Sequence, residues 1–143
     1  MRTSIVIPVY NSARTIGPLV ERLLAVLAMG ALQIVLVNDG SVDDSDAACR
    51  AVSARYLGTV TYVRLSRNFG EHNAVMAGLH HARGDYVVIM DDDGQNPPQE
   101  VPRLIDHAAS HGLDIVYYSD HRTMPDNVRD AASRADGRVA DPG

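Results

Sequence analysis

The sequence has little of what several classes of protein require. It contains a single cysteine, Cys49, so an internal disulfide framework is excluded and a reducing compartment is favoured. Its formal net charge of −5 argues against a surface that holds a nucleic-acid backbone, because such a surface needs clustered Lys and Arg. We therefore expect no nucleic-acid partner.

Long hydrophobic runs are also missing. The N-terminal stretch "MRTSIVIPVY" has too short an apolar run for a signal peptide, and Pro8 interrupts it. The longest apolar stretch, "LLAVLAMGAL", has ten residues, whereas a membrane-spanning helix needs about 20. We expect no transmembrane segment and a cytoplasmic location, with peripheral attachment to a membrane as an open alternative.

Short β-rich runs alternate with longer helical patterns, which predicts an α/β fold with a mostly parallel sheet flanked by helices. About five strands are expected, at residues 4–9, 33–37, 60–65, 86–90 and 113–118. Helices are expected at residues 16–27, 44–56, 71–82 and 97–110. Gly30 is expected to end the first helix, and Ser41 with Asp44 resembles a capping box for the second.

The length of 143 residues corresponds to about one domain. We expect this domain to cover residues 1–118. Residues 119–143 have few large apolar side chains and no clear period, so they are expected to form a loose C-terminal tail.

Polar residues follow each of the first four predicted strands. In an open α/β sheet, ligands bind beyond the carboxyl ends of the strands, so these residues are expected to meet at one edge. The clusters are Pro8, Tyr10 and Asn11; Asn38 to Ser41; Arg67 and Asn68; and Asp91 to Asp93.

The acidic cluster stands in "VVIMDDDGQNPP", residues 87–98. Two unit charges about 4 Å apart repel by about 4 kcal/mol at an effective dielectric near 20, so adjacent carboxylates favour a divalent cation. Oxygen ligands in this spacing suit Mg²⁺ or Mn²⁺, whose open positions substrate phosphates commonly fill. If the strand runs through Asp91, then Asp91 and Asp93 share a face and Asp92 points elsewhere. A solvated turn is the alternative. An EF-hand loop is excluded, because Asn96 and Pro102 stand where it needs Gly and Glu.

Several of these segments together resemble a known family. The segments are "SIVIPVYNSARTI", "VLVNDGSVDDS" and "LSRNFGEHNAVMAGLHHARGDYVVIMDDDGQNPPQEVPRLI". They are similar to the nucleotide-binding half of family 2 glycosyltransferases with the Rossmann-like GT-A fold, especially the polyprenyl-phosphate branch that includes dolichol-phosphate mannose synthases. The resemblance covers about residues 3 to 106, and four separated blocks agree in order and spacing.

The resemblance implies a role for each matching block. Pro8, Tyr10 and Asn11 match the block that lines the nucleotide pocket, where an aromatic ring can stack on the base or hydrogen-bond to the ribose. Asp39 matches the acid that contacts the base or the ribose. Their structural alternatives are a strand-ending turn and a helix-capping aspartate.

The phosphate-binding blocks match as well. Arg67 matches an arginine that can offset phosphate charge, although a plain surface arginine is the alternative. Asp91 and Asp93 match the D-x-D pair that holds the cation on the donor diphosphate, and we count Asp91 and Asp92 among the nucleotide-binding residues. No catalytic residue can be assigned.

The chain also departs from the family pattern. Ser12 stands where many polyprenyl-phosphate enzymes have Glu, and Asp92 stands where Ala is usual. The acceptor-binding half that normally follows the fifth strand has no counterpart in residues 119–143, so we expect a truncated GT-A domain. Self-association is expected, because such a sheet would leave an edge or an apolar surface uncovered.

Three functions remain open. The first is metal-dependent transfer of a sugar from a UDP- or GDP-sugar to an acceptor, with a polyprenyl phosphate as the candidate acceptor. The second is a nucleotidyltransferase, although "IPVYNSART" lacks the Gly-rich loop expected after its first strand. The third is a non-catalytic remnant that binds a nucleoside diphosphate. His107 and His111 are i,i+4 neighbours without a third ligand, so no metal chemistry is assigned to them.

Overall fold

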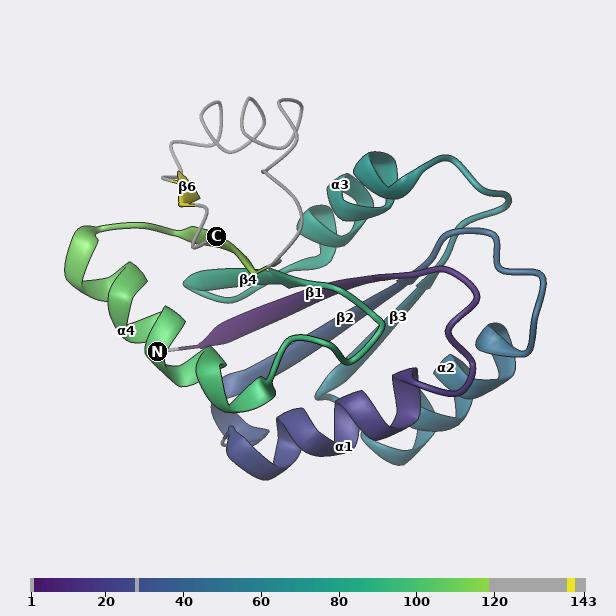
Figure 1. The fold of residues 1–143 in the computed structure, drawn as a ribbon, viewed down its shortest axis with the longest axis horizontal. Coiled ribbons are helices and arrows are strands. Elements are labelled where there is room, and N and C mark those ends of the chain that lie inside the picture. Colours follow the sequence, from purple (N-terminus) through teal and green to yellow (C-terminus); the bar gives the residue numbers. More distant parts are fainter. Residues whose placement is uncertain (1, 28, 119–138, 141–143) are drawn as a thin grey trace.

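The computed structural model of the chain describes residues 2–27, 29–118 and 139–140. Their strands form one sheet in the order β3-β2-β1-β4-β5-β6, and every neighbouring pair is parallel (Figure 1). The strands are β1 (Thr3–Val9), β2 (Leu32–Asn38), β3 (Val60–Arg64), β4 (Tyr86–Met90), β5 (Ile115–Tyr118) and β6 (Val139–Ala140). The predicted parallel α/β sheet is confirmed, including its first five strands.

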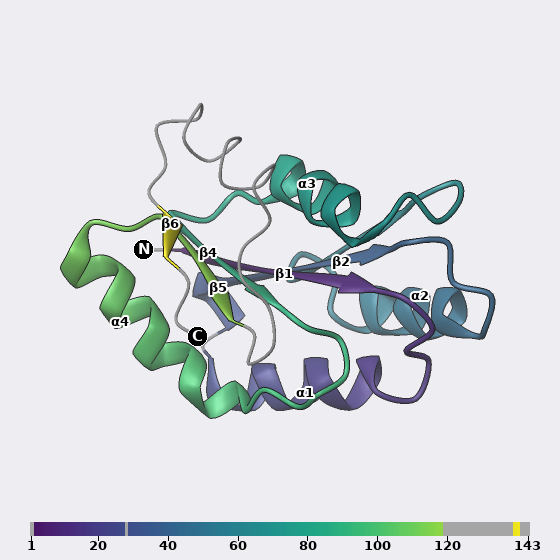
Figure 2. The ribbon, with the colours of Figure 1, turned by 45° about the horizontal axis from the view of Figure 1, so that its top comes forward.

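Helices cover both faces of the sheet, unequally (Figures 1 and 2). The α-helices are α1 (Ile16–Val26), α2 (Ser45–Arg55), α3 (Glu71–His81) and α4 (Val101–His111). Helices α1, α2 and α4 lie on one face, and α3 lies on the other. Two short 3₁₀ helices complete the described elements, η1 (Met29–Ala31) and η2 (Pro98–Glu100). Each helix among the described residues is too short or too polar to cross a membrane.

The core follows from the alternation of side chains along the central strand. In β1, Ile5 and Ile7 belong to the cluster that includes the buried side of α1, while Val6 packs in the cluster of α3 on the opposite face. All three side chains are fully buried. A strand buried on both faces is apolar almost throughout, which is why no polar alternation marks β1 or β2 in the sequence.

Two predicted helix-terminus features, the end of the first helix at Gly30 and the capping box of the second, are wrong. Helix α1 ends at Val26, because Leu27 takes an extended conformation, and Gly30 lies beyond the helix in η1. The capping box is not formed, since Asp44 is the N-cap residue of α2 without a side-chain capping bond. The Ser41 hydroxyl instead accepts a hydrogen bond from the Asn11 amide, at 3.0 Å.

The segment expected to form a loose tail falls mainly outside the described residues. Only positions 139 and 140 are described, and they form β6, paired in parallel with β5. The predicted division at residue 118 stays a prediction.

Two loops come into backbone contact at the carboxyl edge of the sheet. Gly40, which follows β2, has a φ of +68°. A Cβ at this position would overlap the backbone of Arg67 and Asn68, which follow β3. Glycine is therefore required at this position for two reasons: its backbone has a positive φ, and the loop after β3 leaves no room for a Cβ atom.

We expect Gly40→Ala to destabilise the fold more than Gly58→Ala. Gly58 also has a positive φ, of +86°, but a Cβ there meets nothing within 4 Å. Both substitutions carry the left-handed backbone cost of about 1–2 kcal/mol, and Gly40→Ala adds an overlap cost of about 1–3 kcal/mol. Urea unfolding of both variants measures the difference. Equal losses of unfolding free energy would show that the two loops are not packed together.

Candidate functional site

The loops that follow the first four strands enclose a cavity of about 280 Å³. We call it the strand-end cavity; it is lined by Pro8, Val9, Tyr10, Asp39, Asn68, Gly70, Glu71 and Asp92. The predicted clusters after β1, β2, β3 and β4 each contribute to it, so their convergence on one edge is confirmed. Of these eight lining residues, three carry carboxylates and none is basic.

Asp39 is held in place by two neighbouring strand ends. Its amide donates to the Val9 carbonyl at 2.8 Å, and its Oδ1 atom accepts the Phe69 amide at 2.8 Å. The residue is only 4% exposed, yet it lines the strand-end cavity. Asp39 is not the N-cap residue of α2, so the helix-capping role considered from the sequence is wrong. Its carboxylate instead holds the loop that follows β3.

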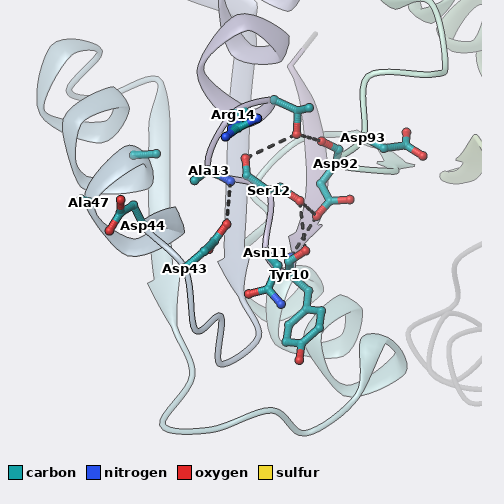
Figure 3. A pocket seen from close by; sticks show the side chains of 12 residues that line it. Tyr10, Asn11, Ser12, Ala13, Arg14, Asp43, Asp44, Ala47, Asp92 and Asp93 are labelled. Carbon is teal, nitrogen blue, oxygen red and sulfur yellow. Dashed lines mark hydrogen bonds between the residues drawn. The ribbon is translucent and has the colours of Figure 1, made fainter.

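Asp92 joins the end of β4 to the loop that follows β1. Its Oδ2 atom accepts the Tyr10 amide at 2.9 Å and the Ser12 hydroxyl, and its backbone carbonyl accepts the Thr15 hydroxyl at 2.8 Å (Figure 3). Both of these hydrogen bonds to the Asp92 carboxylate use its Oδ2 atom.

Sequence reasoning missed these partners of Asp92. From the sequence, Asp92 is counted among the nucleotide-binding residues, but Ser12 and Asp92 are treated as two separate departures from the family pattern. That pair of departures was the available signal, because the two side chains contact each other across 80 positions of sequence. No comparable signal marked Thr15 or the cavity-lining Glu71.

A second, larger cavity of about 1280 Å³ adjoins the first. Figure 3 shows the side chains that line it. We call it the loop cavity; it is lined by residues 10–15 together with Asp43, Asp44, Ala47, Ala48, Asp92 and Asp93. Tyr10 and Asp92 line both cavities. A hydrogen bond from Ser45 is the main cause that lowers the pKa of Asp43 below its usual value, so this carboxylate is charged at neutral pH. The lining of the loop cavity includes four carboxylates and one guanidinium, that of Arg14.

The other two aspartates of the triplet are placed differently from each other. Strand β4 ends at Met90, so strand alternation does not extend through Asp91. Asp93 is exposed, lines the loop cavity and accepts the Gln95 amide at 3.0 Å. Asp91 is half-buried and is not among the lining residues of either cavity.

No ready-made metal centre accompanies the triplet. In residues 2–27, 29–118 and 139–140, no three His, Cys, Asp or Glu side chains are grouped so as to hold a metal ion. A cation at Asp91 or Asp93 would therefore need oxygen ligands from another molecule to complete its coordination.

Three predicted nucleotide-binding residues lie outside the strand-end cavity: Asp91, Arg67 and Asn11. The Arg67 guanidinium is exposed and lies 4.6 Å from the centroid of the Phe69 ring. Asn11 has a φ of 52°, which asparagine tolerates, and its Oδ1 accepts the Val42 amide at 2.9 Å. Asn11 thus joins the loops after β1 and β2, and it lines the loop cavity.

Cys49 offers no nucleophile to the site. Its side chain is fully buried, and burial is the main cause that raises the pKa of the thiol to about 12. The thiolate, which is the reactive form, is therefore negligible at neutral pH.

The chain is similar to part of two longer transferases. It is 46% identical over 115 residues to the undecaprenyl-phosphate 4-deoxy-4-formamido-L-arabinose transferase of Edwardsiella ictaluri (strain 93-146), covering 79% of this chain and 35% of that protein. It is 44% identical over 133 residues to the protein of the same name from Pseudomonas paraeruginosa (strain DSM 24068 / PA7), covering 92% and 38%. The chain thus spans about a third of the length of these relatives.

Solved structures share the fold at lower identity. The mannosyltransferase PcManGT from Pyrobaculum calidifontis, in complex with GDP-Man and Mn²⁺, has a TM-score of 0.70 and 24% identity, over 78% of this chain and 33% of that one. The S. aureus protein TarS, residues 1–349, in complex with UDP-GlcNAc, has a TM-score of 0.68 and 21% identity, over 87% and 37%. These matches confirm the predicted GT-A fold. The family model for glycosyl transferase family 2 matches residues 4–136, so the chain belongs to this family.

Proposed function

We propose that this chain binds the nucleoside diphosphate part of a nucleotide sugar, as the donor-binding part of a glycosyltransferase. The observation that carries the proposal is the strand-end cavity, to which four strand ends contribute. The complexes of PcManGT with GDP-Man and of TarS with UDP-GlcNAc support it, since both proteins share this fold.

The nucleoside is the part of the donor that fits the strand-end cavity. Its volume of about 280 Å³ lies near the lower end of ligand cavities, so a whole nucleotide sugar would extend out of it. Tyr10 is 48% exposed and offers an aromatic face at this cavity. Asp39 offers a carboxylate oxygen that accepts N–H or O–H groups of the base or the ribose.

In this arrangement the diphosphate extends out of the strand-end cavity past Asp92. Its negative charge is the main obstacle to binding. Carboxylates dominate both cavities, so phosphates would be repelled unless a cation lies between them. We assign Mg²⁺ or Mn²⁺ to Asp91 and Asp93, because such ions are commonly held by one or two carboxylates together with substrate phosphates. When bound, this ion would offset charge on the departing nucleoside diphosphate. Arg67 remains a candidate for a phosphate contact.

The acceptor is proposed from the relatives, whose names specify undecaprenyl phosphate. A polyprenyl phosphate supplies a phosphate oxygen that can attack the anomeric carbon of the sugar. Its lipid tail would place the protein at a membrane surface, on the cytoplasmic side in our proposal. The residues that position this acceptor are not assigned, and self-association stays a prediction.

The first test is whether nucleotide and cation bind together. We expect Mn²⁺ alone to bind weakly, because no three-ligand group is present among the described residues. Calorimetry should show that Mn²⁺ strengthens binding of UDP or GDP at least about tenfold, as expected when a cation neutralises adjacent like charges.

Asp93→Asn and Asp91→Asn should remove most of this metal effect. Asp106→Asn, on the exposed side of α4, is the matched control and should retain it. Equal nucleotide affinity with Mn²⁺ and with a chelator would refute the cation assignment. The measured affinity itself tests nucleotide binding, so the two claims are judged separately.

The second test separates the binding role of Asp39 from its structural role. Asp39→Asn keeps an oxygen for the Phe69 amide but turns an N–H group toward the cavity. Nucleotide binding should weaken by about 1–3 kcal/mol, with little change in unfolding free energy. Asp39→Ala should weaken nucleotide binding and also lower the unfolding free energy, since the Phe69 amide is left without its acceptor. Wild-type affinity in Asp39→Asn would mean that Asp39 only holds the loop.

A further inference from the structure

A chain of hydrogen bonds lies behind the turn that carries Asp39. The Ser41 amide donates to Asn38 Oδ1 at 3.1 Å, and Asn38 Nδ2 lies 3.0 Å from the Tyr62 hydroxyl. The Tyr62 hydroxyl donates to Asp46 Oδ1 at 2.6 Å. This chain of hydrogen bonds thus runs from the first turn of α2, across β3, to the end of β2.

The direction of these bonds follows from the chemistry of the groups. The hydrogen bond from Tyr62 is the main cause that lowers the pKa of Asp46. The Asp46 carboxylate is therefore ionised at neutral pH and can only accept hydrogen bonds. Tyr62 keeps its proton, since burial is the main cause that raises its pKa to about 12. Its hydroxyl therefore donates to Asp46 and accepts from Asn38 Nδ2. That choice directs Asn38 Oδ1 toward the Ser41 amide.

Asp46 is itself fixed at the far end of the chain. The Arg50 Nε atom lies 3.1 Å from both of its carboxylate oxygens, and Arg64 approaches within 3.8 Å. Asn38, at the other end, is 2% exposed, so its amide group has few alternative partners. A buried amide group that loses one hydrogen-bond partner still carries the free-energy cost of its desolvation. This cost favours the intact chain of hydrogen bonds.

The turn at residues 38–41 is where three loops meet. Asp39 accepts the Phe69 amide from the loop after β3, and Ser41 accepts the Asn11 amide from the loop after β1. Any rotation of this turn would move the Asp39 carboxylate within the strand-end cavity.

We propose that Tyr62 is a positioning residue for this cavity: through Asn38 it sets the turn at residues 38–41 and thereby the direction of the Asp39 carboxylate. Tyr62 lines neither cavity, so it acts without touching the ligand. The effect on affinity rests on the proposed nucleotide binding, whereas the effect on the turn does not.

Tyr62→Phe removes the hydroxyl and little else. With Mn²⁺ present, affinity for UDP or GDP should fall about 5- to 10-fold, because of the two bonds lost it is the neutral one with Asn38 that acts on the turn. Tyr56→Phe is the matched control, because the Tyr56 hydroxyl also donates to a carboxylate, Glu21 Oε1 at 2.8 Å, but neither residue lines the strand-end cavity or the loop cavity. Its nucleotide affinity should match the wild type.

A double-mutant cycle distinguishes positioning from general loosening of the fold. If Tyr62 acts through Asp39, Tyr62→Phe should weaken binding in the wild type but have little further effect in Asp39→Asn. An equal loss of affinity in both backgrounds would overturn the proposal.

Amide hydrogen exchange tests the same proposal without a nucleotide. The Ser41 and Phe69 amides should exchange faster in Tyr62→Phe and keep their wild-type rates in Tyr56→Phe. If the wild type binds neither UDP nor GDP, the proposed function fails, and exchange still decides the role of Tyr62. Faster exchange of both amides supports it, and unchanged rates overturn it.

Discussion

The parallel pairing of β1 with two neighbours is the constraint on which the site depends. β1 pairs with β2 along Thr3–Val9 and with β4 along Thr3–Val6, so all three strands run toward the same edge. A slip of one residue would exchange the two buried faces of β1, so the register is strongly specified. This pairing brings Tyr10 and Asp92 into hydrogen-bond contact although 82 positions separate them in the sequence.

Carboxylates at this edge also hold the loops to one another. Asp39 accepts an amide of the loop after β3, while Asp43 and Asp92 accept amides of the loop after β1. The same bonds that fix the loops therefore concentrate negative charge around both cavities. In our proposal a cation offsets the repulsion that a nucleoside diphosphate would meet there, which links the bonds that hold the loops to the proposed metal dependence.

The sequence predicted what depends on local pattern and failed where distant side chains meet. Apolar runs located the first five strands, and the rule for carboxyl ends of parallel strands placed Tyr10, Asp39 and Asp92 together. The expected alternation of Asp91 and Asp93 along a strand is not formed, because β4 ends at Met90. The roles of Ser12 and Tyr62 depend on contacts between separate loops and elements, and no local spacing encodes such contacts.

The most direct test of the central claim is a crystal structure of the chain with GDP or UDP and Mn²⁺, with anomalous data that locate the manganese. We expect the nucleoside in the strand-end cavity between Tyr10 and Asp39, and a manganese peak that contacts Asp91 or Asp93 and the diphosphate. A nucleoside in the loop cavity beside Arg14, or manganese away from the acidic triplet, would contradict it.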